Sequence, residues 1–239
     1  MDYEQYAFVE LRSWQKSMME DPSLFSLISK KIQARINSYI PEKVHKTITT
    51  VIKQMTRSVL FGAKFSSKDP ANMESLQKTE EQVSLLIKQY RKTGAIEGGI
   101  TGAGGILLGL ADFPILIGIK FKLLFEIATL YGFNVKDYKE RLFILHVFQL
   151  AFSSPKHRKK IFLEMRNWEE HISRLPDDIN QFDWRSFQQE YRDYIDLAKM
   201  AQLLPGIGAV VGVIANYQLL NKLGETAMNS YRMRLYGEN

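Results

Sequence analysis

The fold of this chain depends on the stretch GGITGAGGILLGLADFPILIGI at residues 98–119. The stretch is long and apolar, six of its first twelve residues are glycine, and its one charged residue is Asp112. Three structures are compatible with such a composition: a membrane span, a loop that binds phosphate, or a helical corner packed closely inside a protein.

A phosphate-binding loop is not expected here. A P-loop needs the pattern GxxxxGK[ST], whose lysine reaches the phosphates, but no lysine follows these glycines before Lys120. The dinucleotide fingerprint GxGxxG also fails at its two partial matches. Leu107 replaces the third glycine after Gly102 and Gly104, and Val211 replaces it after Gly206 and Gly208. No strand is predicted before residues 98–119 or before Gly206, so nucleotide binding is not indicated.

A single membrane span is disfavoured by two residues inside the stretch. A span needs about 20 mostly apolar residues, but a carboxylate such as Asp112 is costly in hydrocarbon. Asp112 followed by Pro114 is typical of a helix start with an aspartate N-cap. The pattern therefore predicts two helical pieces, about 98–110 and 113–131. A hairpin of these two pieces that is inserted into one side of a membrane remains an alternative.

Close packing of helices is the favoured interpretation of the glycines. Small residues four apart let two helix backbones approach each other, and a glycine inside a helix otherwise costs about 1 kcal/mol relative to alanine. A second glycine-rich apolar run occurs at 203–220. The glycines expected to pack closely, or to line an apolar pocket, are Gly98, Gly102, Gly105, Gly109, Gly208 and Gly212.

The rest of the 239 residues predicts an all-α protein with a single helical domain, in which the glycine-rich runs form helical hairpins or corners. Ser67 or Asp69 is a candidate cap for a helix that runs to about residue 92, and the final residues 221–237 are interpreted as a tail. Other helices are predicted at 2–20, 24–39, 42–61, 136–152, 156–172 and 184–203.

The segment 42–61 has the clearest helical pattern and is strongly basic on one side. Its apolar side chains recur at about 100° per residue, and the basic ones lie opposite. The surrounding segment 23–64 holds eight basic residues and one acidic residue and so carries +7, whereas the rest of the chain sums to −1 and gives the net charge of +6. The pattern leaves open whether the apolar side contacts lipid or the core. The basic residues proposed to bind a membrane are Lys43, Lys46, Lys53 and Arg57.

No catalytic or metal-binding pattern stands out. The chain has no cysteine, and its four histidines lack metal-ligand spacing. His146 is expected to be a hydrogen-bonded core histidine. No cofactor is expected, and scattered aromatic residues do not indicate nucleic-acid binding. The carboxylates Glu97, Asp112, Glu126 and Glu140 could form an acid–base pair, but structural roles are favoured, as for the polar residue Asn216.

The chain resembles the EcsC family. The resemblance covers most of the chain in order and rests on these stretches: WQKSMMEDPSL (14–24), INSYIPEKVH (36–45), GGITGAGG (98–105), ADFP (111–114), YGF (131–133), KERLF (139–143), LPGIGAVVGVIANY (204–217) and YRMRL (231–235). It implies a mostly helical bacterial protein, cytoplasmic or peripheral to the membrane. It also implies association with an ABC transporter linked to secretion and protein processing.

These observations lead to one expected function and two alternatives. We expect a non-enzymatic protein that binds an anionic membrane surface or lipid at the inner face of the cell membrane, with N-terminal helices at 1–66 and an EcsC-like core at 67–239 forming one unit. The start of the chain does not resemble a signal peptide, in line with a cytoplasmic location. The alternatives are an adaptor that binds the transporter or a protease, and an enzyme on lipid or peptide that uses paired carboxylates.

Overall fold

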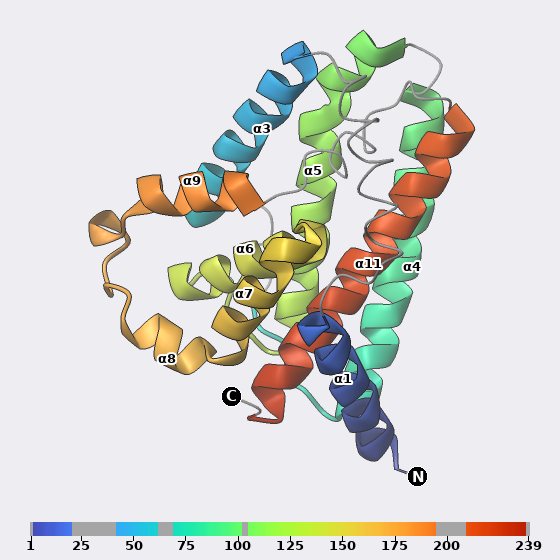
Figure 1. Cartoon of the computed structure of the whole chain (residues 1–239). Helices are drawn as coiled ribbons and strands as arrows, with labels where there is room; N and C mark the ends of the chain where they lie inside the picture. The colour runs from blue at the N-terminus through green and yellow to red at the C-terminus, as the bar shows by residue number, and fades with distance from the viewer. Residues whose placement is uncertain (1, 21–41, 62–68, 102–104, 195–208, 238–239) are drawn as a thin grey trace.

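The computed structural model describes the chain except residues 1, 21–41, 62–68, 102–104, 195–208 and 238–239 (Figure 1). Within the helices, side chains are described except at residues 43–45, 94–101, 105–112, 155, 156, 192–194 and 209–215. The elements are α1 (Tyr3–Met19), α3 (Glu42–Leu60), α4 (Leu76–Thr101), α5 (Gly105–Leu130), α6 (Tyr138–Phe152), α7 (Pro155–Arg166), α8 (Trp168–Ser173), the 3₁₀-helix η2 (Ile179–Gln181), α9 (Trp184–Tyr194) and α11 (Ala209–Leu235). The predicted all-α class is confirmed.

Three long helices, α4, α5 and α11, pack against one another (Figure 1). Helix α11 packs along α4 and also contacts α5 and α6. Val83 of α4 and Leu223 of α11 are fully buried in this contact region, and Phe121 of α5 stacks on Phe148 of α6 with ring centroids 4.6 Å apart. Burial of such side chains stabilises the fold by roughly 1.5–3 kcal/mol each.

One glycine allows α11 and α4 to approach closely. A Cβ atom placed on Gly224 of α11 would lie 2.5 Å from Cδ1 of Ile87 in α4, so no larger residue fits without movement. This is the kind of contact predicted for the glycine-rich runs, but it occurs at a glycine four residues beyond the second run. The glycines singled out from the sequence lie where side-chain surroundings are not described.

The last part of the chain is not a tail, because α11 continues through it to Leu235. Its buried Arg232 forms a two-pronged ion pair with buried Glu80 of α4, with N–O distances of 2.7 and 2.6 Å. Tyr131 and Tyr3 also donate hydrogen bonds to the Glu80 carboxylate, at 2.9 and 2.6 Å. This cluster joins α1, α4 and α11 to the end of α5, so the tail interpretation was wrong.

The predicted break at Asp112 was also wrong. Helix α5 runs without interruption from Gly105 to Leu130 with Pro114 inside it, and the preceding helix α4 ends at Thr101. A proline inside a helix removes one hydrogen bond and costs about 3 kcal/mol. Burial of Phe113, Leu116 and Ile117 beside the proline offsets that cost.

The cap predicted at Ser67 or Asp69 was wrong as well. Helix α4 begins at Leu76, where the Ser75 hydroxyl accepts a hydrogen bond from the Lys78 amide at 3.3 Å. Asp69 lies before the helix and forms an exposed ion pair with Lys136 at 2.6 Å. Ser67 and the helix predicted at 24–39 lie outside the described residues.

No helix in the described part of the chain combines the length and hydrophobicity needed to cross a bilayer.

Candidate functional site

Helix α3 turns its apolar face inward and its basic face outward. Ile48, Ile52 and Val59 are almost completely buried, and the helix packs on α5, α6 and α9. The question left open by the sequence is therefore answered for these residues: the apolar face packs into the protein core. Any attachment of this helix to a membrane has to use its outer, charged face.

The outer face presents the predicted basic residues that the structure describes. Lys46, Lys53 and Arg57 are all exposed on α3, spaced seven and four residues apart, so they lie along one side of the helix. Lys46 has an exposed partner, Glu42, at 3.2 Å, and such a surface ion pair contributes little. The side chain of Lys43 lies outside the described residues.

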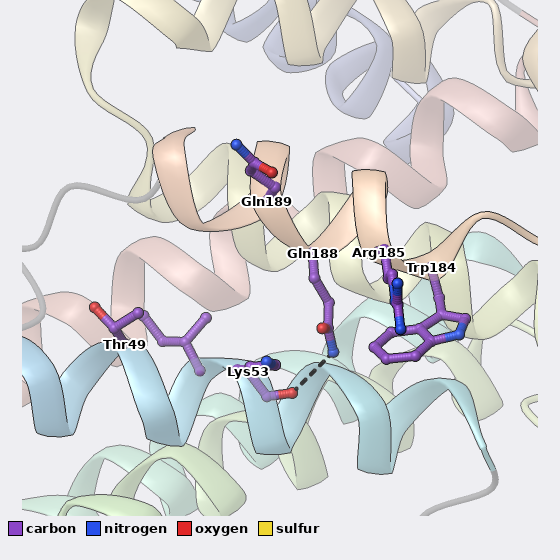
Figure 2. Close-up of a pocket in the computed structure, with 7 residues that line it drawn as sticks. Thr49, Lys53, Trp184, Arg185, Gln188 and Gln189 are labelled. Atoms are coloured by element: carbon purple, nitrogen blue, oxygen red, sulfur yellow. Dashed lines mark hydrogen bonds between the residues drawn. The ribbon is translucent and has the colours of Figure 1, made fainter.

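A groove of about 380 Å³ lies between α3 and α9 (Figure 2). Thr49, Ile52 and Lys53 contribute one side of the groove. The other side comes from α9 and consists of Trp184, Arg185, Gln188 and Gln189. Among these described residues the charged ones are both cations, so the groove is suited to an anion.

Helix α9 is held by an aspartate cap at its N-terminus and by one hydrogen bond to α3. Asp183 precedes the helix and accepts hydrogen bonds from the Ser186 amide at 3.1 Å and the Ser186 hydroxyl at 2.8 Å. These bonds lower the pKa of the Asp183 carboxyl, which therefore stays ionised as an N-cap. Gln188 then donates from Nε2 to the Lys53 carbonyl at 3.2 Å, joining the two helices (Figure 2).

The aromatic ring of Trp184 lies beside the basic face of α3. The Arg57 guanidinium carbon lies 4.8 Å from the centroid of the Trp184 ring, within the range of a cation–π contact. Trp184 is half-buried and Arg57 is exposed. This arrangement places an indole, a ring that prefers membrane–water interfaces, beside the exposed cation of Arg57.

The sequence did not reveal the α9 side of the groove. Trp184, Arg185 and Gln188 are more than 120 residues from α3, and no spacing in the sequence links them to it. The only local signal was the start of a helix at Trp184. Which helix it would contact depends on the tertiary fold.

The glycines and polar residues expected in an apolar pocket are only partly placed. Gly98, Gly105, Gly109 and Gly212 lie on helices, but their surroundings are not described, and Gly102 and Gly208 fall outside the described residues. The side chains of Glu97 and Asp112 are likewise not described. Asn216 is buried on α11, where its Oδ1 lies 3.4 Å from Nζ of the buried Lys120.

The two described carboxylates from the proposed acid–base set have separate partners. Glu126 accepts a hydrogen bond from Tyr90 at 3.0 Å. Glu140 is buried, accepts from Tyr231 at 2.8 Å and pairs with Arg234 at 2.6 Å. Burial raises the pKa of Glu140, while Arg234 and Tyr231 oppose the rise. Both therefore have structural contacts between helices.

His146 is a buried core histidine, as predicted. It is 4% exposed, and its Nδ1 lies 2.8 Å from the Leu142 carbonyl. Burial lowers the pKa of His146 to about 4, so the ring is neutral at pH 7. No group of three His, Asp or Glu side chains converges to hold a metal ion in the described part of the chain.

Comparison with known proteins places the chain in a family. The model of the EcsC protein family matches residues 5–236. The protein EcsC of Bacillus subtilis (strain 168) is 45% identical over 96% of this chain and 94% of its own length. The uncharacterized protein YdbA of the same organism is 24% identical over 94% of this chain and 90% of its own length. No solved structure matches. The chain therefore belongs to the EcsC protein family.

Proposed function

We propose that this protein is a non-enzymatic membrane-peripheral protein that binds anionic lipid head groups through the basic surface of α3 and α9. We define this surface as Lys46, Lys53, Arg57, Trp184 and Arg185, and the sequence adds Lys43 as a predicted member. The observation that supports it is the two-sided arrangement of α3: a buried apolar face and an outward row of exposed cations beside a groove.

The buried apolar face determines the kind of attachment that we propose. An amphipathic helix that inserts into a bilayer uses its apolar side, but Ile48, Ile52 and Val59 already pack inside the protein. Binding by the basic surface then depends on electrostatic attraction, with the Trp184 indole as an interfacial contact. Each lysine or arginine near an anionic surface contributes about 1 kcal/mol, and salt screens it.

The place of binding in the cell is part of the same proposal. We expect the inner face of the cell membrane, where anionic lipids attract basic surfaces, and association with an ABC transporter as the family resemblance implies. If the basic surface instead binds a protein partner, recruitment to membranes will require that partner.

Flotation with lipid vesicles tests the proposal. Purified protein is mixed with vesicles of neutral lipid, or of neutral lipid with an anionic phospholipid, at low and high salt. We expect flotation with anionic vesicles only, and loss of flotation at high salt. The variant K46Q/K53Q/R57Q should bind roughly a hundredfold more weakly, since about 3 kcal/mol of attraction is removed.

A matched variant controls for net charge. K88Q/K92Q/K159Q removes three exposed lysines from α4 and α7 and changes the total charge by the same amount. It should float like the unmodified protein. Equal losses in the two variants, or no flotation of the unmodified protein with anionic vesicles, would contradict binding by the basic surface.

A further inference from the structure

A second cavity, also of about 380 Å³, lies on the opposite side of α9 from the basic groove. Helices α6, α7, α8 and α9 and the connection between α8 and α9 all contribute to it. On α9, residues 184, 185, 188 and 189 line the groove, and residues 186, 187, 190 and 191 line the cavity. At 100° per residue these two sets lie on opposite faces of the helix.

The charged residues that line the cavity are carboxylates. Glu164, Asp183 and Glu190 are among its described lining residues, and none of those residues is a lysine or an arginine. Asp183 is occupied by Ser186 as a helix cap. Glu164 forms an ion pair with Lys160 on the same helix, with the two charged atoms 3.7 Å apart, and Glu190 is exposed. Glu190 therefore remains to attract a positive charge, and Glu164 adds a carboxylate whose charge is shared with Lys160.

The two histidines of the cavity are acceptors as well. A carbonyl oxygen only accepts hydrogen bonds, so the contact with Leu142 requires that Nδ1 of His146 carries the proton and that Nε2 carries a lone pair. His171 packs against His146, with ring centroids 5.6 Å apart. Burial lowers the pKa of His171, and nearby Arg174 adds to the effect. Neutral imidazoles do not repel a cationic ligand.

One residue that lines this cavity has a buried polar group without a partner among the described residues. The side chain of Tyr191 lines the cavity and is 1% exposed, yet its hydroxyl makes no hydrogen bond within the described part of the chain. A buried hydroxyl without a hydrogen bond is unfavourable, so a ligand in the cavity that bonds this hydroxyl would gain from it. Phe182 and Phe187 add aromatic rings, with centroids 5.6 Å apart.

We propose that this cavity binds a small organic cation, a primary ammonium group on an apolar body. The ammonium group would lie between Glu164 and Glu190, where its three N–H donors meet carboxylate and imidazole acceptors. The apolar body would lie against Phe182 and Phe187. The volume, the aromatic rings and the lack of converging metal ligands among the described residues favour an organic molecule over a bare metal ion.

Calorimetric titration with two matched probes tests this proposal. Phenethylamine carries an ammonium group on an apolar body, and phenylacetate carries a carboxylate on a similar body. We expect saturable binding of phenethylamine and none of phenylacetate. Glu190→Gln should weaken binding about tenfold, since it removes one charge-assisted contact. Glu169→Gln, which removes an exposed carboxylate from α8 outside the cavity, should leave binding unchanged.

Imidazole NMR signals locate the binding site independently of affinity. Phenethylamine should shift the ring signals of His146 and His171 and leave those of His157, which is not a lining residue of the cavity, in place. The proposal is overturned if phenethylamine does not bind, if both probes bind equally, if Glu190→Gln binds as well as the unmodified protein, or if the signals of His146 and His171 do not move. None of these outcomes depends on whether the basic surface binds lipid.

Discussion

Helix α9 separates a groove lined by cations from a cavity lined by carboxylates and neutral imidazoles. The two spaces have similar volumes, but their side chains attract ligands of opposite charge. The difference arises from one short helix, because an α-helix places residues 184, 185, 188 and 189 on one face and 186, 187, 190 and 191 on the other. The comparison predicts that a substitution in the groove alters lipid binding without altering binding in the cavity, and that the reverse also holds.

The largest effect should follow from reversing charge on the basic side. Lys53→Glu combined with Arg57→Glu changes four units of charge at about 1 kcal/mol each, so affinity for anionic vesicles should fall roughly a thousandfold. Both residues are exposed, and the fold should persist. Calorimetric titration with phenethylamine should give the same affinity as before. If the variant loses affinity for both anionic vesicles and phenethylamine, the groove and the cavity are not independent.

The buried His146 in the cavity should make the stability of the protein depend on pH. His146 has a pKa of about 4 in the folded protein and about 6.5 when unfolded, so only the unfolded chain takes up a proton between these values. The free energy of unfolding should therefore fall by up to about 3 kcal/mol as pH drops from 6.5 to 4. Urea unfolding at several pH values measures this. In His146→Gln the dependence should be clearly flatter, and an equally steep curve would argue against a buried neutral ring.

The packing of α11 on α4 depends on the close contact at Gly224. Gly224→Ala should lower the free energy of unfolding by about 1–2 kcal/mol, because the new Cβ overlaps Ile87 and the helix preference of alanine only partly compensates. Gly118→Ala is the matched control on α5, where the new Cβ meets only Met55 at 3.9 Å. That change should raise stability by up to about 1 kcal/mol. Similar effects of the two changes would rule out close approach at Gly224.

The smallest effect should come from the unpartnered hydroxyl. Tyr191→Phe removes a buried polar atom without a hydrogen bond, so stability should stay the same or rise by up to about 1 kcal/mol. Tyr131→Phe removes a hydroxyl that donates to Glu80 and should lower stability by about 1–2 kcal/mol. Chemical unfolding of both variants compares them directly. A clear loss for Tyr191→Phe would mean that its hydroxyl already has a partner.

The basic side was predictable from the sequence because one continuous helix carries both faces of the pattern. The buried Ile48 and Ile52 and the exposed Lys46, Lys53 and Arg57 all lie in α3, as their spacing predicted. The cavity was not predictable, since four helices and a connection contribute to it and no local spacing relates His146 to Glu190. His146 was correctly predicted as buried, but its neighbours follow from the tertiary fold.

The errors in the fold prediction have a common cause. The aspartate and proline at 112–114 favour a helix start locally, but burial of the adjacent apolar side chains keeps α5 continuous. The polar sequence of 221–237 looks like a tail, but ion pairs of Arg232 and Arg234 with buried carboxylates hold it within the fold. In both places tertiary contacts outweigh the local preference.

The fluorescence of Trp184 tests the lipid-binding account most directly. The chain has three tryptophans, and Trp14→Phe with Trp168→Phe leaves Trp184 as the only one, beside Arg57 at the groove. Anionic vesicles should shift its emission to shorter wavelength in a saturable way, neutral vesicles should not, and high salt should reverse the shift. If this variant floats with anionic vesicles while its emission stays unchanged, the protein binds lipid through another surface and the assignment to α3 and α9 is wrong.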